Sequence, residues 1–210
     1  LYEGPNKMKK LGSENFDVMG LAVSSGKIYA SGHPNAGSKF PAPVGLISST
    51  DNGKSWNLIS LQGKVDFHML EVSGKEIYGA DSQSGNLMYS SDSGKKWVSL
   101  GAAKYQDIAM SSPKIAFAVL GKKIVMTKNA FKSTTEIKTD FDAQTVETID
   151  SGLYASSGKT LYHTSDLGKK WVAVSTFKDQ ISVVTASSKS IVVVAGPSIL
   201  ISTDSGKTFK

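Results

Sequence analysis

The stretch from residue 48 to residue 56 reads SSTDNGKSW. Related phrases begin at residue 90 (SSDSGKKW), residue 164 (TSDLGKKW) and residue 202 (STDSGKTF), and a degenerate copy begins at residue 125 (VMTKNAFKST). Aligned on Asp51, Asp92, Asn129, Asp166 and Asp204, the copies are separated by 41, 37, 37 and 38 residues. A period of this length that runs through the chain is typical of an array of similar supersecondary units.

Each repeat contains four short apolar runs separated by turn residues. In the first repeat these runs are VMGLAVS, KIYASG, GLISST and SWNLIS. Four strands that recur about every forty residues are typical of a propeller blade, because one four-stranded meander cannot bury both of its faces alone. A parallel βαβ fold is excluded, since no segment keeps a helical period long enough to cross over. The sequence therefore predicts an all-β protein, a β-propeller of four-stranded antiparallel blades.

The number of blades depends on the first residues of the chain. Five repeats follow an N-terminal stub, LYEG and NKMKKLG, which resembles the third and fourth strands of a preceding blade. We therefore expect a six-bladed propeller with a partial N-terminal blade, and seven blades as the alternative. Residues 1–210 are expected to form one propeller domain that lacks its N-terminal strands.

The repeated phrase has a mechanical explanation, and we call each copy an aspartate turn. Ser and Asp side chains accept hydrogen bonds from nearby backbone N–H groups, Gly permits a positive φ, and the aromatic residue returns to the apolar layer. The residues assigned this structural role are Ser49, Asp51, Gly53, Trp56, Asp92, Gly94, Trp97, Asp166, Gly168, Trp171, Asp204, Gly206 and Phe209. A catalytic residue is not needed once in every repeat, so these aspartates are not expected to be catalytic.

The motif S-x-D-x-G-x-[ST]-W is matched in full by residues 49–56 and resembles the Asp-box, or BNR repeat, of sialidases, sortilin-type receptors and photosystem assembly-factor-like propellers. The phrases YASGHP, PVGLISSTDNGKSW and DFHML are similar to those of bacterial secreted or lipoprotein BNR-repeat proteins labelled glycosyl-hydrolase-like. This resemblance implies a propeller that is extracellular or attached to the cell envelope.

The amino-acid composition argues against several classes of function. The net charge of +6 is carried by 24 lysines without any arginine, and these lysines are scattered among turns, so a nucleic-acid partner is not expected. The chain has no cysteine and no apolar run that could span a membrane, and we expect a monomer. Sialidases hold the substrate carboxylate with an arginine cluster, so the lack of arginine argues against that activity.

Loop length indicates where a ligand would bind. The connection between the second and third runs is long in repeat one (SGHPNAGSKFPAP) and repeat two (DSQSGN), and short in the later repeats. It lies at the end of the blade opposite the aspartate turns. The candidate ligand-binding or metal-binding residues at this end are His33, Asp66, His68, Asp17 and Asp81.

These side chains permit several kinds of site. Asp66 precedes His68 by two positions, so their side chains should point the same way along a strand. Imidazoles and carboxylates that converge from adjacent blades can bind a divalent metal, a sugar hydroxyl or the tail of a protein partner. The structural alternative is that Asp17 and Asp66 bond to backbone groups and that His68 is an interior residue. His163, which lies just before an aspartate turn, is expected to be structural.

Two functions remain open at this stage. The first is a non-catalytic binding or scaffolding propeller that takes a glycan or protein ligand, with a divalent metal as a candidate cofactor. The alternative is a glycoside hydrolase, which needs two carboxyl groups facing one sugar. The carboxylates available for that reaction near the long loops are Asp17, Asp66, Glu71 and Asp81.

Overall fold

The computed structural model describes residue 10, residues 12–149 and residues 152–210. The chain divides into two compact units, Leu1–Ala103 (unit 1) and Lys104–Lys210 (unit 2). Every regular element in the described residues is a β-strand, so none of these residues belongs to a helix long and apolar enough to cross a membrane.

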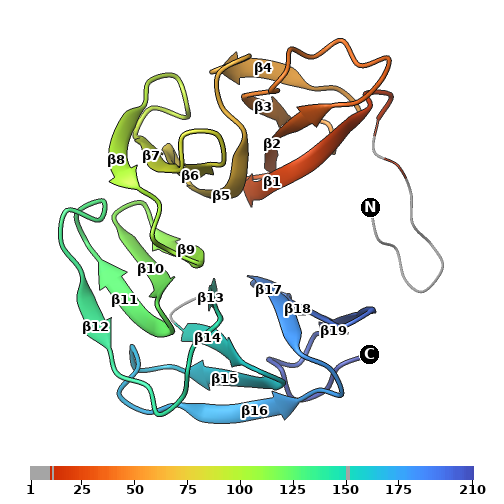
Figure 1. The fold of residues 1–210 in the computed structure, drawn as a ribbon. Coiled ribbons are helices and arrows are strands. Elements are labelled where there is room, and N and C mark those ends of the chain that lie inside the picture. Colours follow the sequence, from red (N-terminus) through yellow and green to blue (C-terminus); the bar gives the residue numbers. More distant parts are fainter. Residues whose placement is uncertain (1–9, 11, 150–151) are drawn as a thin grey trace. The chain divides into compact units, whose positions relative to one another are not determined.

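Unit 1 contains two antiparallel four-stranded sheets among its described residues, in which each strand pairs with the next one along the chain (Figure 1). The first sheet consists of β1 (Phe16–Ser24), β2 (Lys27–Pro34), β3 (Leu46–Ser49) and β4 (Asn57–Ser60). The second consists of β5 (Phe67–Ser73), β6 (Glu76–Asp81), β7 (Asn86–Ser90) and β8 (Val98–Ala102). The four runs that the first repeat predicts as strands are confirmed.

Unit 2 contains three further sheets in its described residues, built in the same way. The third sheet consists of β9 (Asp107–Ser112), β10 (Ile115–Leu120), β11 (Lys123–Thr127) and β12 (Thr135–Ile137). The fourth consists of β13 (Thr145–Ile149), β14 (Gly152–Ser157), β15 (Thr160–Thr164) and β16 (Val172–Thr176). The fifth consists of β17 (Ile181–Ser187), β18 (Ser190–Ala195) and β19 (Ser198–Ser202). Lys210 exchanges two backbone hydrogen bonds with Ile201 of β19, at 2.9 and 3.1 Å.

The predicted number of blades is wrong. The described residues form five blades, the last with three strands, and not six or seven. The extra blade depends on the stub at residues 1–12, of which residues 1–9 and 11 lie outside the described residues. A pattern of apolar and turn residues is compatible with a strand, but a blade also needs partner strands to satisfy its backbone N–H and C=O groups.

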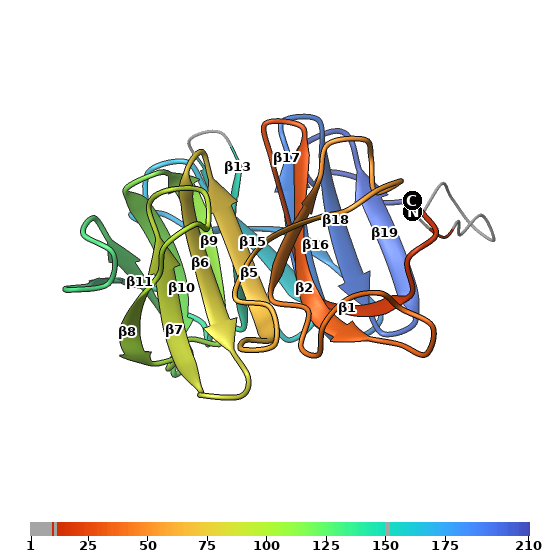
Figure 2. The same ribbon diagram turned by 90° about the horizontal axis from the view of Figure 1, so that it is seen from above.

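Neighbouring sheets within a unit cover one another's apolar faces. In unit 1, β1 lies beside β5 (Figures 1 and 2). The two sheets share a core in which Leu46 packs with Phe67 and Ile77. In unit 2, β13 lies between β9 and β17. This burial is the reason why each meander is stable, since a single sheet leaves one face in water.

The aspartate turns form the bonds expected from their residues. Ser49 Oγ accepts hydrogen bonds from the backbone N–H groups of Gly53 (2.8 Å) and Asp51 (3.3 Å) and donates to Asp51 Oδ1 (2.7 Å). Asp51 in turn accepts a hydrogen bond from the backbone N–H of Ser55 (2.9 Å). Together with the Ser55 hydroxyl, these bonds lower the pKa of the Asp51 carboxyl well below its usual range. The aspartate is therefore a charged acceptor that closes the β3–β4 turn.

The degenerate copy keeps the same bonds with different residues. Thr127 Oγ1 accepts from the backbone N–H of Phe131 (3.0 Å), and Asn129 Oδ1 accepts from that of Ser133 (3.0 Å). Phe131 occupies the position of the glycine and has a positive φ of 57°. The predicted register of Asn129 with the aspartates is thereby confirmed.

The glycine of the second aspartate turn also contacts the preceding blade. Gly94 has φ +82°, and a Cβ at this position would lie 2.2 Å from Cδ2 of Leu46, which is fully buried in the first sheet. The turn is completed by Trp97, whose Nε1 donates to Ser60 Oγ (3.0 Å) in β4. The second aspartate turn therefore joins the two blades of unit 1 as well as two strands of its own blade.

We predict that Gly94→Ala destabilises the chain by roughly 1–3 kcal/mol more than Gly85→Ala does, because the added methyl group overpacks the core around Leu46. Gly85 is the matched control, since it has a similar φ of +67°, but a methyl group added there would have no atom within 4 Å. The measurement is urea unfolding followed by tryptophan fluorescence. Equal losses in the two variants would show that only the backbone conformation matters at Gly94.

Candidate functional site

Three of the predicted residues converge in unit 1, at the ends of strands. His33 is the penultimate residue of β2, immediately before the long loop, and His68 is the second residue of β5. Asp66 lies in the connection from β4, directly before β5. In an antiparallel meander these positions are at the end opposite the β3–β4 turn. The structure therefore places them at the end that carries the long loops, with His33 on the strand itself.

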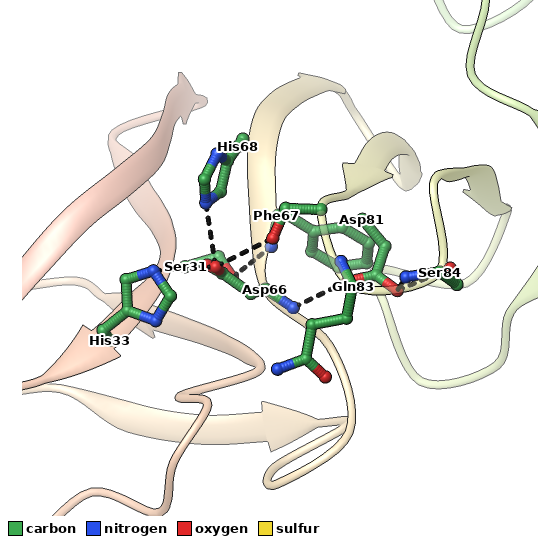
Figure 3. A network of polar contacts seen from close by, with 9 residues as sticks. Ser31, His33, Asp66, Phe67, His68, Asp81, Gln83 and Ser84 are labelled. Carbon is green, nitrogen blue, oxygen red and sulfur yellow. Dashed lines mark hydrogen bonds and ion pairs between the residues drawn. The ribbon is translucent and has the colours of Figure 1, made fainter.

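The centre of this cluster is the carboxylate of Asp66. Its Oδ2 lies 2.9 Å from Nε2 of His33 and 2.8 Å from Nε2 of His68 (Figure 3). The side chain of Asp66 is fully buried, whereas those of His33 and His68 are 48% and 43% exposed. The two imidazole rings are perpendicular to each other, with centroids 5.9 Å apart. We call these three residues the histidine–aspartate cluster.

Asp66 is held from several sides. Ser82 Oγ donates a hydrogen bond to Asp66 Oδ2 (3.0 Å), and the backbone N–H of Ser82 donates to the carbonyl oxygen of Asp66 (2.9 Å). The backbone N–H of Asp66 donates to Asp81 Oδ1 (2.9 Å). The next N–H, that of Phe67, donates to Ser31 Oγ (3.0 Å) in β2 (Figure 3). The carboxylate is therefore fixed in position before any ligand arrives.

A β-bulge orients His68. Phe67 pairs with Asp81 and Met69 pairs with Ala80, so His68 is the extra residue on β5. The same irregularity in β1 makes Met19 the extra residue, because Val18 and Gly20 pair with consecutive residues of β2. Bulges of this kind redirect a side chain locally. The bulge thus recurs in both blades of unit 1, and the second blade places an imidazole on it.

The other two predicted residues lie outside this cluster and make different contacts. Asp81 is buried and accepts hydrogen bonds from the backbone of Asp66, Gln83 and Ser84 and from the Ser84 hydroxyl. Burial alone would raise the pKa of Asp81, but the bonds from Ser84, Asp66 and Gln83 outweigh it and lower the pKa. Asp17 pairs with His33 across the sheet and is exposed, and its Oδ1 accepts a bond from Asn35 Nδ2 (2.9 Å).

We predict that Asp81→Ala destabilises the chain by about 1–3 kcal/mol, because the buried N–H of Asp66 loses its acceptor. Asp17→Ala removes a carboxylate of the same size from an exposed position and should change stability by less than about 0.5 kcal/mol. Thermal unfolding of both variants beside the unaltered chain provides the measurement. A loss at Asp17 as large as that at Asp81 would contradict the assignment of Asp81 as the support of Asp66.

Two partly buried carboxylates in unit 2 were not predicted from the sequence. Asp107 Oδ2 in β9 accepts a hydrogen bond from the backbone N–H of Val146 in β13 (2.9 Å). Glu147 Oε2 in β13 accepts one from the backbone N–H of Ala186 in β17 (3.2 Å). Burial raises the pKa of Asp107 to about 6 and, together with the charge of Asp107, that of Glu147 to about 7, although backbone hydrogen bonds act in the opposite direction. Each carboxylate links the first strand of one blade to that of the next.

A signal for one of them was present in the sequence. Asp107 is the first residue of its repeat's first strand, close to the place that Asp17 and Asp66 take in theirs. Glu147 does not take that place in its repeat. Its partial burial becomes evident only from the packing of β17 against β13.

We predict that Glu147→Gln becomes progressively more stable relative to the unaltered chain as pH rises from about 5 to about 8. The folded pKa of Glu147 is about 7, above its unfolded value of 4.5, so the folded state binds the proton more tightly. The stability from Glu147 is complete below the unfolded pKa and is lost as pH rises through the folded pKa. Glutamine cannot ionise, and the expected gain of the variant at pH 8 is roughly 1–3 kcal/mol.

Thermal unfolding of both proteins across this pH range supplies the measurement. The comparison reports on Glu147 together with its interaction with Asp107, because the remaining titrating groups, including His163 with its burial-lowered pKa, are common to both proteins. A stability difference that stays constant with pH would contradict the raised pKa.

Unit 2 also contains a cavity of about 660 Å³. Phe117, Leu153 and Ile115 form apolar walls, and Ser111 and Lys169 are among its polar residues. Asp166 of the third complete aspartate turn also lines it, so the cavity lies at the end of the blades that carries these turns. Loop length places ligands at the opposite end, so this cavity was not predicted.

His163 has the structural environment that was expected for it. Its ring packs on that of Tyr154 with centroids 4.5 Å apart, and burial lowers its pKa. Of the three histidines, two therefore belong to the histidine–aspartate cluster and one to the packing of β14 against β15.

The histidine–aspartate cluster combines a rigid buried anion with two partly exposed imidazoles. A buried carboxylate is costly unless cations or hydrogen-bond donors surround it. Here Oδ2 has three partners, while Oδ1 is buried without a hydrogen-bond partner in the described residues. The site can therefore present imidazole nitrogens to a ligand on its open side and hold positive charge over the carboxylate.

Comparison with solved structures identifies the class of fold as a β-propeller. The structure titled YCF48 bound to D1 peptide is similar with a TM-score of 0.58 and 16% identity, covering 97% of this chain and 69% of that one. A nidogen/laminin complex matches with a TM-score of 0.68 and 11% identity, covering 92% and 78% of the two chains. YCF48 from Cyanidioschyzon merolae matches with a TM-score of 0.57 and 14% identity, covering 94% and 71%. At these identities the likeness shows the fold alone.

No protein-family model matches the sequence, and no curated protein matches it.

Proposed function

We propose that this chain is a non-catalytic binding propeller that holds a protein or peptide partner at the long-loop end of unit 1. The observation that carries the proposal is the histidine–aspartate cluster, in which a fixed buried carboxylate supports two half-exposed imidazoles beside the loop at residues 35–45. Polar groups held on strand ends next to an extended loop are the usual composition of a binding site on a rigid scaffold.

Structures of the same fold support a binding role. One similar propeller is described as bound to D1 peptide, and another belongs to a nidogen/laminin complex. The same architecture thus occurs in proteins that hold peptide and protein partners. Fold likeness is the weaker part of the support, since one fold serves many functions.

The rival function, hydrolysis of a glycan, is less well supported. Of the rim carboxylates considered for it, Asp81 is occupied by four hydrogen bonds and Asp66 by two imidazoles and a hydroxyl. Asp107 and Glu147 have the raised pKa values of general acids, which favours this function. Both, however, accept backbone hydrogen bonds from the neighbouring blade, which explains their burial without a substrate.

We also propose that the chain belongs to the Asp-box, or BNR, class of propellers and acts outside the cytoplasm, in a secreted or envelope-attached form. The support is the motif at residues 49–56 and its recurrence, together with the hydrogen bonds that the aspartate turns share. We propose further that the chain is a monomer and that a glycan is the alternative to a protein ligand.

The test is selection from a library of random peptides displayed on phage, with the immobilised 210-residue chain as target. Peptides enriched on the unaltered chain should bind at least about tenfold more weakly to a His33→Ala/His68→Ala double variant, because both imidazoles are removed from the site. His163→Ala is the matched control and should bind as the unaltered chain does, since His163 packs in unit 2.

Two results would overturn the proposal. One is the absence of any enriched peptide. The other is binding that survives in the double variant but is lost in Ser111→Trp, which adds a large side chain to the lining of the unit 2 cavity; that result would place the site in unit 2. A panel of chromogenic glycosides tests the rival function, and hydrolysis that disappears in Glu147→Gln would favour the enzyme.

A further inference from the structure

Two imidazole nitrogens and one carboxylate oxygen point at the same space in unit 1. Among the described residues, the ligating atoms of His33, Asp66 and His68 all lie within 4.8 Å of one another. They come from two blades, with His33 on β2 and His68 on β5, and approach the carboxylate from separate strands (Figure 3). Imidazole and carboxylate ligands together are typical of sites for divalent transition metals.

The distances agree with a metal-free form of such a site. With metal–ligand distances of about 2.0–2.2 Å, two ligand atoms of a tetrahedral site lie roughly 3.3–3.6 Å apart. The nitrogens of His33 and His68 lie 2.9 and 2.8 Å from Asp66 Oδ2, so each must move outward by less than about 1 Å. Both imidazoles are about half exposed and can make this movement, whereas Asp66 is fixed.

The state of the carboxylate is the independent observation. Asp66 is fully buried, yet its Oδ1 has no hydrogen-bond partner among the described residues. Buried polar groups without a partner are rare in folded proteins and call for an explanation such as an ion. A cation held by the two imidazoles and Oδ2 would neutralise the charge that the carboxylate shares between its two oxygens. The bond from Ser82 is the kind of outer contact that orients a metal-binding carboxylate.

We propose that His33, Asp66 and His68 form a site for a divalent transition-metal ion of the zinc type. Three protein ligands leave at least one coordination position open toward solvent, which is the arrangement of metal sites that accept an exogenous ligand. The inference rests on the proposed function, because it names the ion through which this end of unit 1 would engage its partner. A carboxylate or imidazole of the partner is the chemistry that fits the open position.

The types of ligand in the cluster are expected to make the site selective for transition metals over Ca²⁺ and Mg²⁺. Ca²⁺ and Mg²⁺ prefer six or more oxygen ligands, which this nitrogen-rich cluster does not offer. Neutral imidazoles must supply lone pairs, so binding displaces any proton from the coordinating nitrogens.

The test is titration calorimetry of the 210-residue chain with ZnCl₂, after removal of metal by chelation and in a preparation without a polyhistidine tag. One Zn²⁺ per chain should bind, and His33→Ala or His68→Ala should weaken binding at least about 100-fold because each removes a ligand. His163→Ala is the matched control and should bind normally, because His163 packs on Tyr154 in unit 2 and does not belong to the cluster. Ser82→Ala should weaken binding about tenfold through the orientation of Asp66.

The melting temperature is a second readout, which distinguishes loss of metal binding from failure of a variant to fold. Zn²⁺ should raise the melting temperature of the unaltered chain and of His163→Ala, but not that of His33→Gln or His68→Gln, which keep a polar side chain at each position. Failure of Zn²⁺ to bind, or equal losses in the His163 variant and the cluster variants, would falsify the metal site.

Peptide binding measured with Zn²⁺ and with EDTA separates the two proposals. Peptide binding without any metal binding overturns the metal site and leaves the proposed function standing. Metal binding without any peptide partner does the reverse.

Discussion

A four-stranded sheet with two apolar faces is stable in water only when another surface covers each face. In unit 1 this requirement is met where Leu46 and Tyr29 of the first blade pack with Phe67 and Ile77 of the second. The second aspartate turn also helps to join the two blades. Gly94 can lie against Leu46 only because it has no side chain, and the indole N–H of Trp97 donates a hydrogen bond to Ser60. The positions of His33 and His68 depend on this packing, since each stands on a different blade.

Much of the fold could be predicted because each repeat contains local signals for its strands and for the turn that joins the last two of them. Alternating apolar runs and a recurring turn predict the strands, and the hydroxyl of Ser49 and the carboxylate of Asp51 make the bonds that their chemistry suggests. The number of blades could not be obtained in this way. The stub at residues 1–12 has the composition of strands, but strand pairing depends on a partner that a local pattern does not identify.

The candidate site was predictable to a similar extent. The spacing of Asp66 and His68 predicts that they meet, and the contact of 2.8 Å agrees, although a bulge rather than a regular strand sets the direction of His68. Asp81 has the right location, but its role as the acceptor for the backbone of Asp66 depends on a pairing between β5 and β6. Glu147 was missed because its burial comes from a neighbouring blade, and residue type alone does not reveal that environment.

The loop between β2 and β3 is closed at its base, where the backbone N–H of Val44 donates to the carbonyl oxygen of Gly32 (2.9 Å), directly beside His33. The residues beyond this clamp are also tied to the blade, because the ring of Phe40 packs edge-on against that of Phe16, with centroids 5.5 Å apart, and the backbone N–H of Asn35 donates to the carbonyl oxygen of Asn15 (3.0 Å). The length of the loop and the position of His33 are therefore coupled. A change of loop length that displaces Phe40 or Asn35 would also disturb the strand pair that carries the imidazole.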